Sequence, residues 1–219
     1  MKIILVRHGE NGGPPFDCPE RPVKGYLSDE NGIRQAREIC ESLKDVKIDL
    51  VFSSPYGRAL QTAEIAVGGR NIPIKILPFM KEWTPDMNLE KLPSTEFEKI
   101  NRMVSEKYAE ETWKTELGEG AFDMYARVCP PFLKELDAIG IHSRMGGFVI
   151  DEKARELVIA VFAHGGSLCT LLSFLLGLMP FPIGRFGFRL TGTAVVEYNS
   201  CRDIYYPSLV LPAPGEKPF

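Results

Sequence analysis

The sequence predicts an α/β protein, a three-layer αβα sandwich in which helices cover both faces of a mostly parallel sheet. Short apolar runs rich in β-branched residues, such as residues 3–6 and 157–163, are typical of strands buried on both faces. Up to residue 77 such runs alternate with segments of helical periodicity. This alternation indicates parallel strands that are connected through helices.

The first part of the chain supplies three of the expected strands. The helix after the first strand has Ser28 as its expected N-cap, and its apolar residues fall on one stripe. The next helix is closed by Gly68-Gly69. The expected elements are a strand ending at Arg7, a proline-rich loop over 11–22, a helix from Ser28, a strand over 49–53, a helix over 56–67 and a strand over 72–77.

Residues 80–120 differ in composition and are predicted to form a helical insertion over one edge of the sheet. The segment is polar and rich in lysine and glutamate, and Thr95 with Glu98 makes a capping box at the start of a helix. The apolar stripe of this helix is formed by Phe97, Ile100, Val104 and Tyr108.

The last part of the chain is predicted to complete one domain over 1–219, since this length suffices for a single core. A helix over 121–139 should be kinked or split at Pro130-Pro131, because proline cannot donate its backbone N–H. The other expected elements are a hairpin of residues 148–150 with 157–163, a buried helix over 168–176, a strand over 193–198 and an extended tail from Tyr206.

The composition excludes several classes of protein. A net charge of −3 with interspersed signs argues against nucleic-acid and anionic-membrane partners. The five cysteines are scattered and form no C-x-x-C pair, which argues against a disulfide framework or a zinc site and favours a reducing compartment. The apolar run Leu168–Met179 is shorter than the roughly 20 residues of a membrane span. We therefore expect a cytoplasmic protein.

Cationic side chains follow three of the expected strands. Arg7-His8 ends the first strand, Arg58 begins the helix after the second, and His164 ends the buried strand 157–163. Ligands of open α/β sheets bind at the carboxyl ends of the strands, so these side chains should meet in one crevice. Two arginines and two histidines in a net-acidic protein favour an anion, and a phosphoryl group matches their geometry.

The motifs around these residues resemble those of the histidine phosphatase superfamily, which is also called phosphoglycerate-mutase-like. The resemblance runs in family order from residue 3 to about residue 177. The matching motifs are Arg7-His8-Gly9-Glu10, Leu27-Ser28-x-x-x-Gly32-x-x-Gln35-Ala36, Ser53-Ser54-Pro55-x-x-Arg58-Ala59-x-Gln61-Thr62-Ala63, Glu82 and Ala163-His164-Gly165-Gly166.

The resemblance implies a phosphatase that uses neither a metal ion nor a cofactor and acts on a small phosphorylated metabolite. His8 would be the nucleophile that forms a phosphohistidine, and Glu82 would donate a proton to the leaving alcohol. The phosphoryl oxygens would be bound by Arg7, Arg58, His164 and, through close backbone approach, Gly165. Attack requires one unprotonated ring nitrogen, so the other nitrogen of His8 should donate to a fixed acceptor such as a backbone carbonyl.

The chain departs from the family pattern directly after its first motif. Asn11 and Pro14 stand where the family often has threonine or serine and then asparagine. Asn11 is expected to supply a phosphate contact, and the proline-rich segment Gly12–Pro22 to reshape the mouth of the pocket. The insertion 80–120 would lie over the active-site edge of the sheet.

Several alternatives stay open at the level of sequence. A mutase of the same chemistry is one, although the longer basic segments of the glycolytic mutases are missing, which favours a phosphatase. A phosphate-recognising regulatory protein with poor turnover is another. Glu82 is one glutamate among many in a polar stretch, and a purely structural role is the alternative for it. The oligomeric state is not determined, and a homodimer is compatible with the sequence.

Overall fold

The computed structural model describes residues 1–12, 27–28, 30–83, 95–96, 99, 102, 114–115, 118–179 and 185–211. The strands of its main sheet are β1 (Lys2–Arg7), β2 (Leu50–Ser53), β3 (Ile74–Ile76), β6 (Ile141–Arg144), β7 (Gly147–Ile150), β8 (Val158–Ala163), β9 (Thr193–Cys201) and β10 (Ile204–Val210). The helices are α1 (Asn31–Leu43), α2 (Gly57–Ala66), α4 (Ala121–Asp137) and α5 (Gly165–Leu175), with short turns of 3-10 helix at η1 (Pro78–Met80) and η4 (Glu152–Ala154). A separate pair of short strands consists of β4 (Lys114–Thr115) and β5 (Gly118–Glu119).

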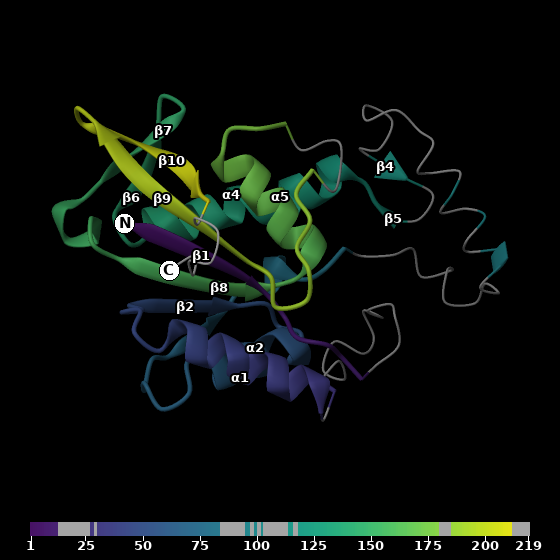
Figure 1. Cartoon of the computed structure of the whole chain (residues 1–219). Helices are drawn as coiled ribbons and strands as arrows, with labels where there is room; N and C mark the ends of the chain where they lie inside the picture. Colours follow the sequence, from purple (N-terminus) through teal and green to yellow (C-terminus); the bar gives the residue numbers. More distant parts are fainter. Residues whose placement is uncertain are drawn as a thin grey trace.

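The main sheet has the strand order β3-β2-β8-β1-β9-β10-β7-β6 (Figure 1). Strands β3, β2, β8 and β1 are parallel to one another, as predicted, whereas β9, β10, β7 and β6 pair antiparallel. The prediction of an α/β fold is confirmed, but the sheet is mixed rather than mostly parallel. The antiparallel half contains the hairpin β6–β7, whose turn residues Met145 and Gly146 have the positive φ of 52° and 76° that a two-residue turn favours.

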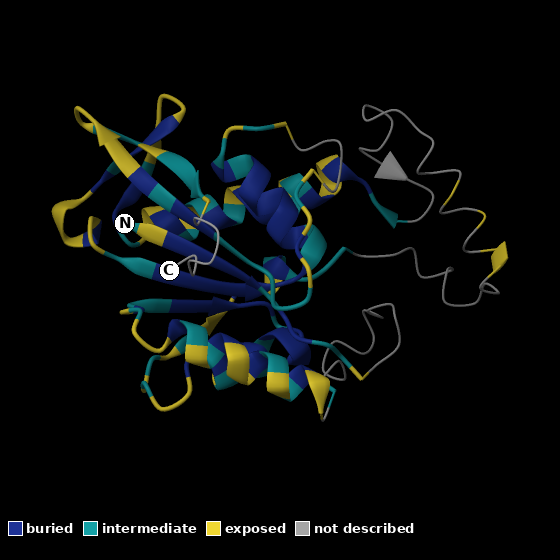
Figure 2. Ribbon diagram, in the orientation of Figure 1, coloured by how far each residue is buried: buried dark blue, intermediate teal, exposed yellow. Residues whose placement is uncertain are grey.

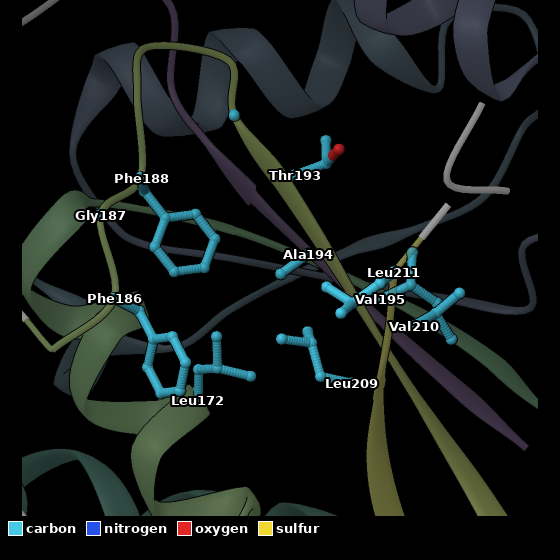
Figure 3. A pocket seen from close by; sticks show the side chains of 11 residues that line it. Leu172, Phe186, Gly187, Phe188, Thr193, Ala194, Val195, Leu209, Val210 and Leu211 are labelled. Atoms are coloured by element: carbon cyan, nitrogen blue, oxygen red, sulfur yellow. The ribbon is translucent and has the colours of Figure 1, made fainter. Parts of the chain in front are cut away.

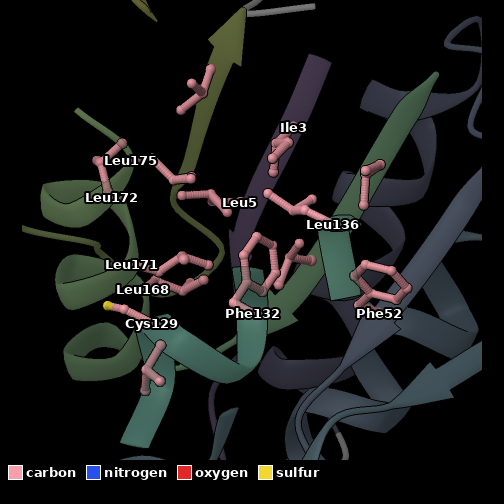
Figure 4. Close-up of a cluster of buried hydrophobic side chains, with 14 of the residues drawn as sticks. Ile3, Leu5, Phe52, Cys129, Phe132, Leu136, Leu168, Leu171, Leu172 and Leu175 are labelled. Carbon is pink, nitrogen blue, oxygen red and sulfur yellow. The ribbon is translucent and has the colours of Figure 1, made fainter. Parts of the chain in front are cut away.

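The sheet separates two hydrophobic cores, which gives the predicted three layers. Ile3 and Leu5 of β1 pack in one core with residues of α4 and α5, whereas Ile4 and Val6 pack in the other with residues of α1 and α2. This division follows from the alternation of side chains along a strand. All four side chains are fully buried, which stabilises the fold by about 1.5–3 kcal/mol each. Figure 2 shows the buried parts of the sheet in dark blue, and Figure 4 shows Ile3 and Leu5 in their core.

Helix α1 begins beside the chain that leaves β1. The predicted N-cap Ser28 is wrong, because the helix begins at Asn31 and Glu30 occupies the N-cap position. The Ser28 hydroxyl still accepts the N–H of Gly32 in the first turn at 2.8 Å. The backbone N–H of Ser28 donates to the carbonyl of Glu10 at 2.8 Å. A Cβ on Gly32 would lie 2.2 Å from that carbonyl oxygen, so only glycine fits here.

The predicted hairpin of residues 148–150 with 157–163 is wrong. Strand β7 pairs with β6 and β10, whereas β8 lies between β2 and β1 in the parallel half. Residues 159–163 are completely buried, and a strand of this kind needs a neighbour on each side and helices on both faces.

Helix α4 is continuous through Pro130 and Pro131 rather than split there. A proline in a helix interior costs about 3 kcal/mol. The buried residues Val128, Phe132 and Leu136 flank the two prolines and pack into the core. This packing outweighs the loss of backbone hydrogen bonds, because most helical stability in proteins comes from tertiary contacts.

Most of the predicted insertion 80–120 lies outside the described residues, including Glu98 and the stripe of Phe97, Ile100, Val104 and Tyr108. Residues 95, 96, 99 and 102 are helical. The single domain over 1–219 stays a prediction. Among the described segments, no helix combines the length and apolar character needed to cross a membrane.

Candidate active site

Arg7, His8, Arg58 and His164 lie at the carboxyl ends of three adjacent parallel strands, β2, β8 and β1. Figure 1 shows these three strands side by side. In the register of β1 and β8, Arg7 lies opposite Ala163, and His8 N–H then donates to the carbonyl of Ala163 at 3.0 Å. His8 and His164 therefore leave neighbouring strands at the same level. Their ring centroids are 5.0 Å apart.

Arg58 connects the two imidazoles. Its Nε donates to Nε2 of His8 at 3.0 Å, and its terminal Nη2 lies 3.1 Å from Nδ1 of His164. We call His8, Arg58 and His164 the histidine cluster. Its members are 4%, 5% and 0% exposed, so the cluster is almost completely shielded from bulk solvent.

The tautomers of both histidines follow from these contacts. A guanidinium can only donate, so Nε2 of His8 and Nδ1 of His164 must be acceptors. The ring proton of His8 then lies on Nδ1 and is donated to the carbonyl of Gly9 at 2.6 Å. The proton of His164 lies on Nε2 and is donated to the Ser54 hydroxyl at 2.7 Å. The backbone acceptor expected for His8 is present.

The surroundings keep both imidazoles neutral. Burial, reinforced by the charge of Arg58, lowers the pKa of His8 to about 3. The same two causes lower the pKa of His164 well below its ordinary value. A neutral His8 with a hydrogen on Nδ1 exposes a lone pair on Nε2, which is the form that can act as a nucleophile.

Thr62 ties the start of α2 to the end of β1. Its hydroxyl accepts the backbone N–H of Gly9 at 3.1 Å and donates to the carbonyl of Arg58 at 2.7 Å. Ser54 and Thr62 belong to the sequence motif of residues 53–63, but the sequence did not indicate their individual contacts. Ser54 binds the cluster directly through the His164 ring, and Thr62 binds it through the backbone carbonyl of Arg58.

Arg7 lies beside the start of α5. Its Nη1 donates to the carbonyl of Phe188 at 2.6 Å, while its buried Nε has no hydrogen-bond partner among the described residues. A Cβ on Gly165 would lie 3.5 Å from the Arg7 guanidinium, so the two residues are in van der Waals contact, and the phosphate contact of Gly165 stays a prediction. A bound anion would satisfy the free Nε of Arg7.

Glu82 reaches the N-terminus of α5. Its carboxylate accepts the N–H of Gly166 at 3.0 Å, of Ser167 at 3.3 Å and of Trp83 at 2.8 Å. These three donors fix the position of the carboxylate at the start of α5. A Cβ on Gly166 would lie 2.6 Å from Oε1 of Glu82, so glycine is required for this contact.

Two residues that the sequence did not indicate hold the Glu82 segment, by which we mean residues 79–83. Arg127 of α4 donates to backbone carbonyls of this segment and is paired with Glu119. An arginine on the half-buried side of an amphipathic helix, eight residues after a glutamate, was the available signal.

Asn11 forms an isolated antiparallel bridge with Leu27, which closes the chain after the first motif. Its predicted phosphate contact stays a prediction. Residues 13–22 of the proline-rich segment lie outside the described residues. Among the described residues, no group of three or more His, Cys, Asp or Glu side chains could hold a metal ion.

An apolar pocket lies between α5 and the antiparallel half of the sheet (Figure 3). It has a volume of about 290 Å³ and is lined by residues that include Leu172, Phe186, Phe188, Val195 and Leu209. Among the described residues that line it, Thr193 is the only one with a hydroxyl and none has an ionisable side chain. The chemistry of the site is therefore concentrated at the histidine cluster and not in this pocket.

Comparisons with known proteins agree with this geometry. "Probable phosphoglycerate mutase GpmB" of Proteus mirabilis is 27% identical over 208 residues, 91% of this chain and 86% of the relative. The "Adenosylcobalamin/alpha-ribazole phosphatase" of Salmonella typhimurium is 30% identical over 152 residues, 63% of this chain and 68% of the relative. The solved structure of YhfR from Bacillus stearothermophilus has the same fold, with a TM-score of 0.68, 20% identity and 95% of each chain covered.

A model of the histidine phosphatase superfamily (branch 1) matches residues 3–205. This match spans nearly the whole chain and includes every residue of the histidine cluster together with Arg7 and Glu82. The chain therefore belongs to branch 1 of the histidine phosphatase superfamily.

Proposed function

We propose that this chain is a metal-independent phosphatase that hydrolyses a small phosphomonoester through a phosphohistidine on His8. The observation that carries the proposal is the state of the His8 imidazole. Its Nδ1 is fixed by the carbonyl of Gly9 at 2.6 Å, and its Nε2 faces the Arg58 guanidinium at 3.0 Å. A histidine nucleophile needs this tautomer, and the phosphoryl group that it attacks needs a cationic neighbour.

The arginines would bind the phosphoryl oxygens. Arg7 has a buried Nε without a partner among the described residues, and a phosphoryl oxygen would accept its hydrogen. Arg58 would turn its N–H groups from the two imidazoles to the substrate, which frees the lone pair on Nε2 of His8. Charge stabilisation of this kind supplies most of the catalysis in phosphoryl transfer.

In the first step Nε2 of His8 attacks phosphorus, so that a P–N bond forms and the P–O bond to the leaving alcohol breaks. A protonated Glu82 gives its proton to the leaving oxygen and becomes a carboxylate. In the second step water attacks phosphorus and gives a proton to Glu82. The P–N bond breaks, its electron pair returns to Nε2, and inorganic phosphate leaves. Proton transfer by a positioned acid contributes about 10²–10⁴-fold in rate.

The reaction is tested first with p-nitrophenyl phosphate, with and without a chelator. We expect turnover in both conditions, and His8→Ala should lose about 10⁴-fold or more because the nucleophile is gone. Mass spectrometry of the wild-type protein after rapid quenching should find a phosphoryl group on His8.

The matched control is His142→Ala. His142 is an exposed histidine on β6 that contacts Asp137 at the end of α4. Strand β6 is the edge strand of the main sheet at the far side from β3. Its substitution should leave the rate unchanged. Undiminished turnover in His8→Ala would contradict the proposal, and tight phosphate binding without turnover in the wild type would indicate a regulatory protein instead.

A phosphoglycerate mutase is the second candidate, because the Proteus mirabilis relative carries that name. The Salmonella typhimurium relative is named as a phosphatase and supports hydrolysis. A mutase would depend on a bisphosphorylated cofactor and would keep a labelled phosphoryl group in an isomer of the substrate. A phosphatase would release the label as inorganic phosphate.

A further inference from the structure

We infer that Arg127, held by Glu119, is a positioning residue for Glu82, and that this pair determines how strongly the enzyme favours easy over difficult leaving groups. The inference rests on the proposed role of Glu82 and adds the device that places its carboxylate. It concerns α4 and the exit of the insertion, which the proposed function itself does not use.

The guanidinium of Arg127 uses all five of its N–H donors. Nη1 donates to the carbonyl of Phe79 at 2.6 Å and to that of Lys81 at 3.1 Å, and Nη2 donates to the carbonyl of Glu82 at 3.2 Å. The remaining two donors bind Glu119, from Nε at 2.5 Å and from Nη2 at 2.7 Å. One side chain thus fixes the backbone of the Glu82 segment at three carbonyls.

Glu119 keeps Arg127 in this orientation. The two side chains are 15% and 19% exposed, and the carboxylate binds the guanidinium through both oxygens. The carbonyl of Glu119 also accepts the indole N–H of Trp83 at 2.7 Å, directly after Glu82 in the chain. Glu119 is the last residue of β5, so the entry and exit of the insertion are joined at this pair.

Glu82 is therefore held from two sides. Its backbone carbonyl is bound by Arg127, and its carboxylate is bound by the N–H groups of Gly166, Ser167 and Trp83. The first of these anchors comes from α4 and the second mainly from the start of α5. If Arg127 is shortened, the carboxylate loses the fixed point that sets its distance from the reacting oxygen, and proton donation weakens.

A residue that only stabilises the fold would lower all rates alike. A residue that positions the acid lowers the rate most for an alkoxide, which cannot leave without a proton, and least for nitrophenolate, which can. The ratio of kcat/KM for p-nitrophenyl phosphate to that for glycerol 2-phosphate therefore separates the two roles.

The test compares Arg127→Lys and Glu119→Gln with the wild type on these two substrates. Lysine keeps the charge but has neither the fork nor the reach to bind three carbonyls and a carboxylate. We expect both variants to lose about 10–100-fold on glycerol 2-phosphate and less than about threefold on p-nitrophenyl phosphate. The matched control is Arg34→Lys in the exposed Arg34–Glu38 pair of α1, which should change neither rate.

Glu82→Gln decides between failure of the inference and failure of the proposed function. It should show the same shift in the ratio, at least as large. If Glu82→Gln shifts the ratio and the two variants at Arg127 and Glu119 do not, the inference alone is overturned. If Glu82→Gln leaves the ratio unchanged, the proposed role of Glu82 is wrong and the inference falls with it, while His8→Ala still tests the nucleophile separately.

Discussion

His8 and His164 lie on neighbouring parallel strands, whereas the Glu82 carboxylate reaches the same place from the segment after β3. The histidine cluster is placed by the register of the sheet, whose strands are buried in two cores. Glu82 is placed by side chain to backbone contacts from α4 and from the start of α5. The two parts of the site therefore depend on different kinds of structure.

The difference predicts that the two parts fail in different ways. A change in the histidine cluster acts on the phosphoryl group that all substrates share, so it should lower every rate by the same factor. A change around Glu82 acts on the leaving group, so its effect should depend on the alcohol. Single substitutions can test whether the two parts fail separately.

After the loss expected for His8→Ala, the next largest effect is expected from Arg58→Met. This variant removes the cation that contacts both imidazoles and keeps an apolar side chain of similar length. We expect kcat/KM to fall by about 10²–10³-fold, equally for p-nitrophenyl phosphate and glycerol 2-phosphate. Arg34→Met on the exposed face of α1 is the control. Unequal losses of kcat/KM on the two substrates would contradict the prediction that the histidine cluster acts on all substrates alike.

Gly166→Ala should act mainly on Glu82, since among the described residues the only other close atom is the flexible end of Met124 at 3.3 Å. The added Cβ would lie 2.6 Å from Oε1 of Glu82, so the carboxylate must move away from the start of α5. We expect a loss of about 10-fold on glycerol 2-phosphate and little change on p-nitrophenyl phosphate. Gly187→Ala is the matched control, because an added Cβ there meets no atom within 4 Å.

The free energy of unfolding should decrease as the pH is lowered, because of the histidine cluster. Burial lowers the pKa of His8 to about 3 in the folded chain, while an unfolded histidine titrates near its ordinary 6.5. Between these values the unfolded state binds more protons, so stability is fully present above pH 6.5 and is lost as the pH falls towards 3.

The expected slope for His8 is up to about 1.4 kcal/mol per pH unit. Chemical denaturation at several pH values in phosphate-free buffer measures it. His8→Asn should reduce the slope, and an unchanged slope in this variant would show that other groups cause the loss.

The smallest effect is expected from Thr62→Val. The variant leaves the buried N–H of Gly9 without its acceptor and removes the hydrogen bond to the carbonyl of Arg58. We expect a loss of about 1 kcal/mol in the free energy of unfolding. Thr62→Ser keeps the hydroxyl and should retain the stability. If both variants have the same free energy of unfolding as the wild type, the Thr62 hydroxyl does not stabilise the histidine cluster.

The proximity of the three residues of the histidine cluster could be predicted from the sequence, because each of them directly follows a strand of the parallel half or begins the next helix. Short-range patterns are enough for such positions. Glu82 was indicated only through the family motif order, and its contacts to Gly166 and Ser167 follow from the tertiary structure.

The role of Arg127 and Glu119 could not be predicted from the sequence, for a physical reason. Arg127 binds carbonyls 45 to 48 residues away, and a backbone carbonyl has no identity in a sequence. The pairing of β7 was wrong for a related reason. The apolar pattern of residues 157–163 indicates burial, but it does not say which strands are the neighbours.

The bridge between Asn11 and Leu27 has a consequence for how the chain between them can change. It joins the two ends of the intervening segment shortly after His8, the proposed nucleophile, and the contact of Ser28 with Glu10 reinforces the junction. The closure entropy of a connection grows only slowly with its length, by about 0.6 kcal/mol for each doubling. We therefore expect that insertions and deletions between these two residues leave His8 in place.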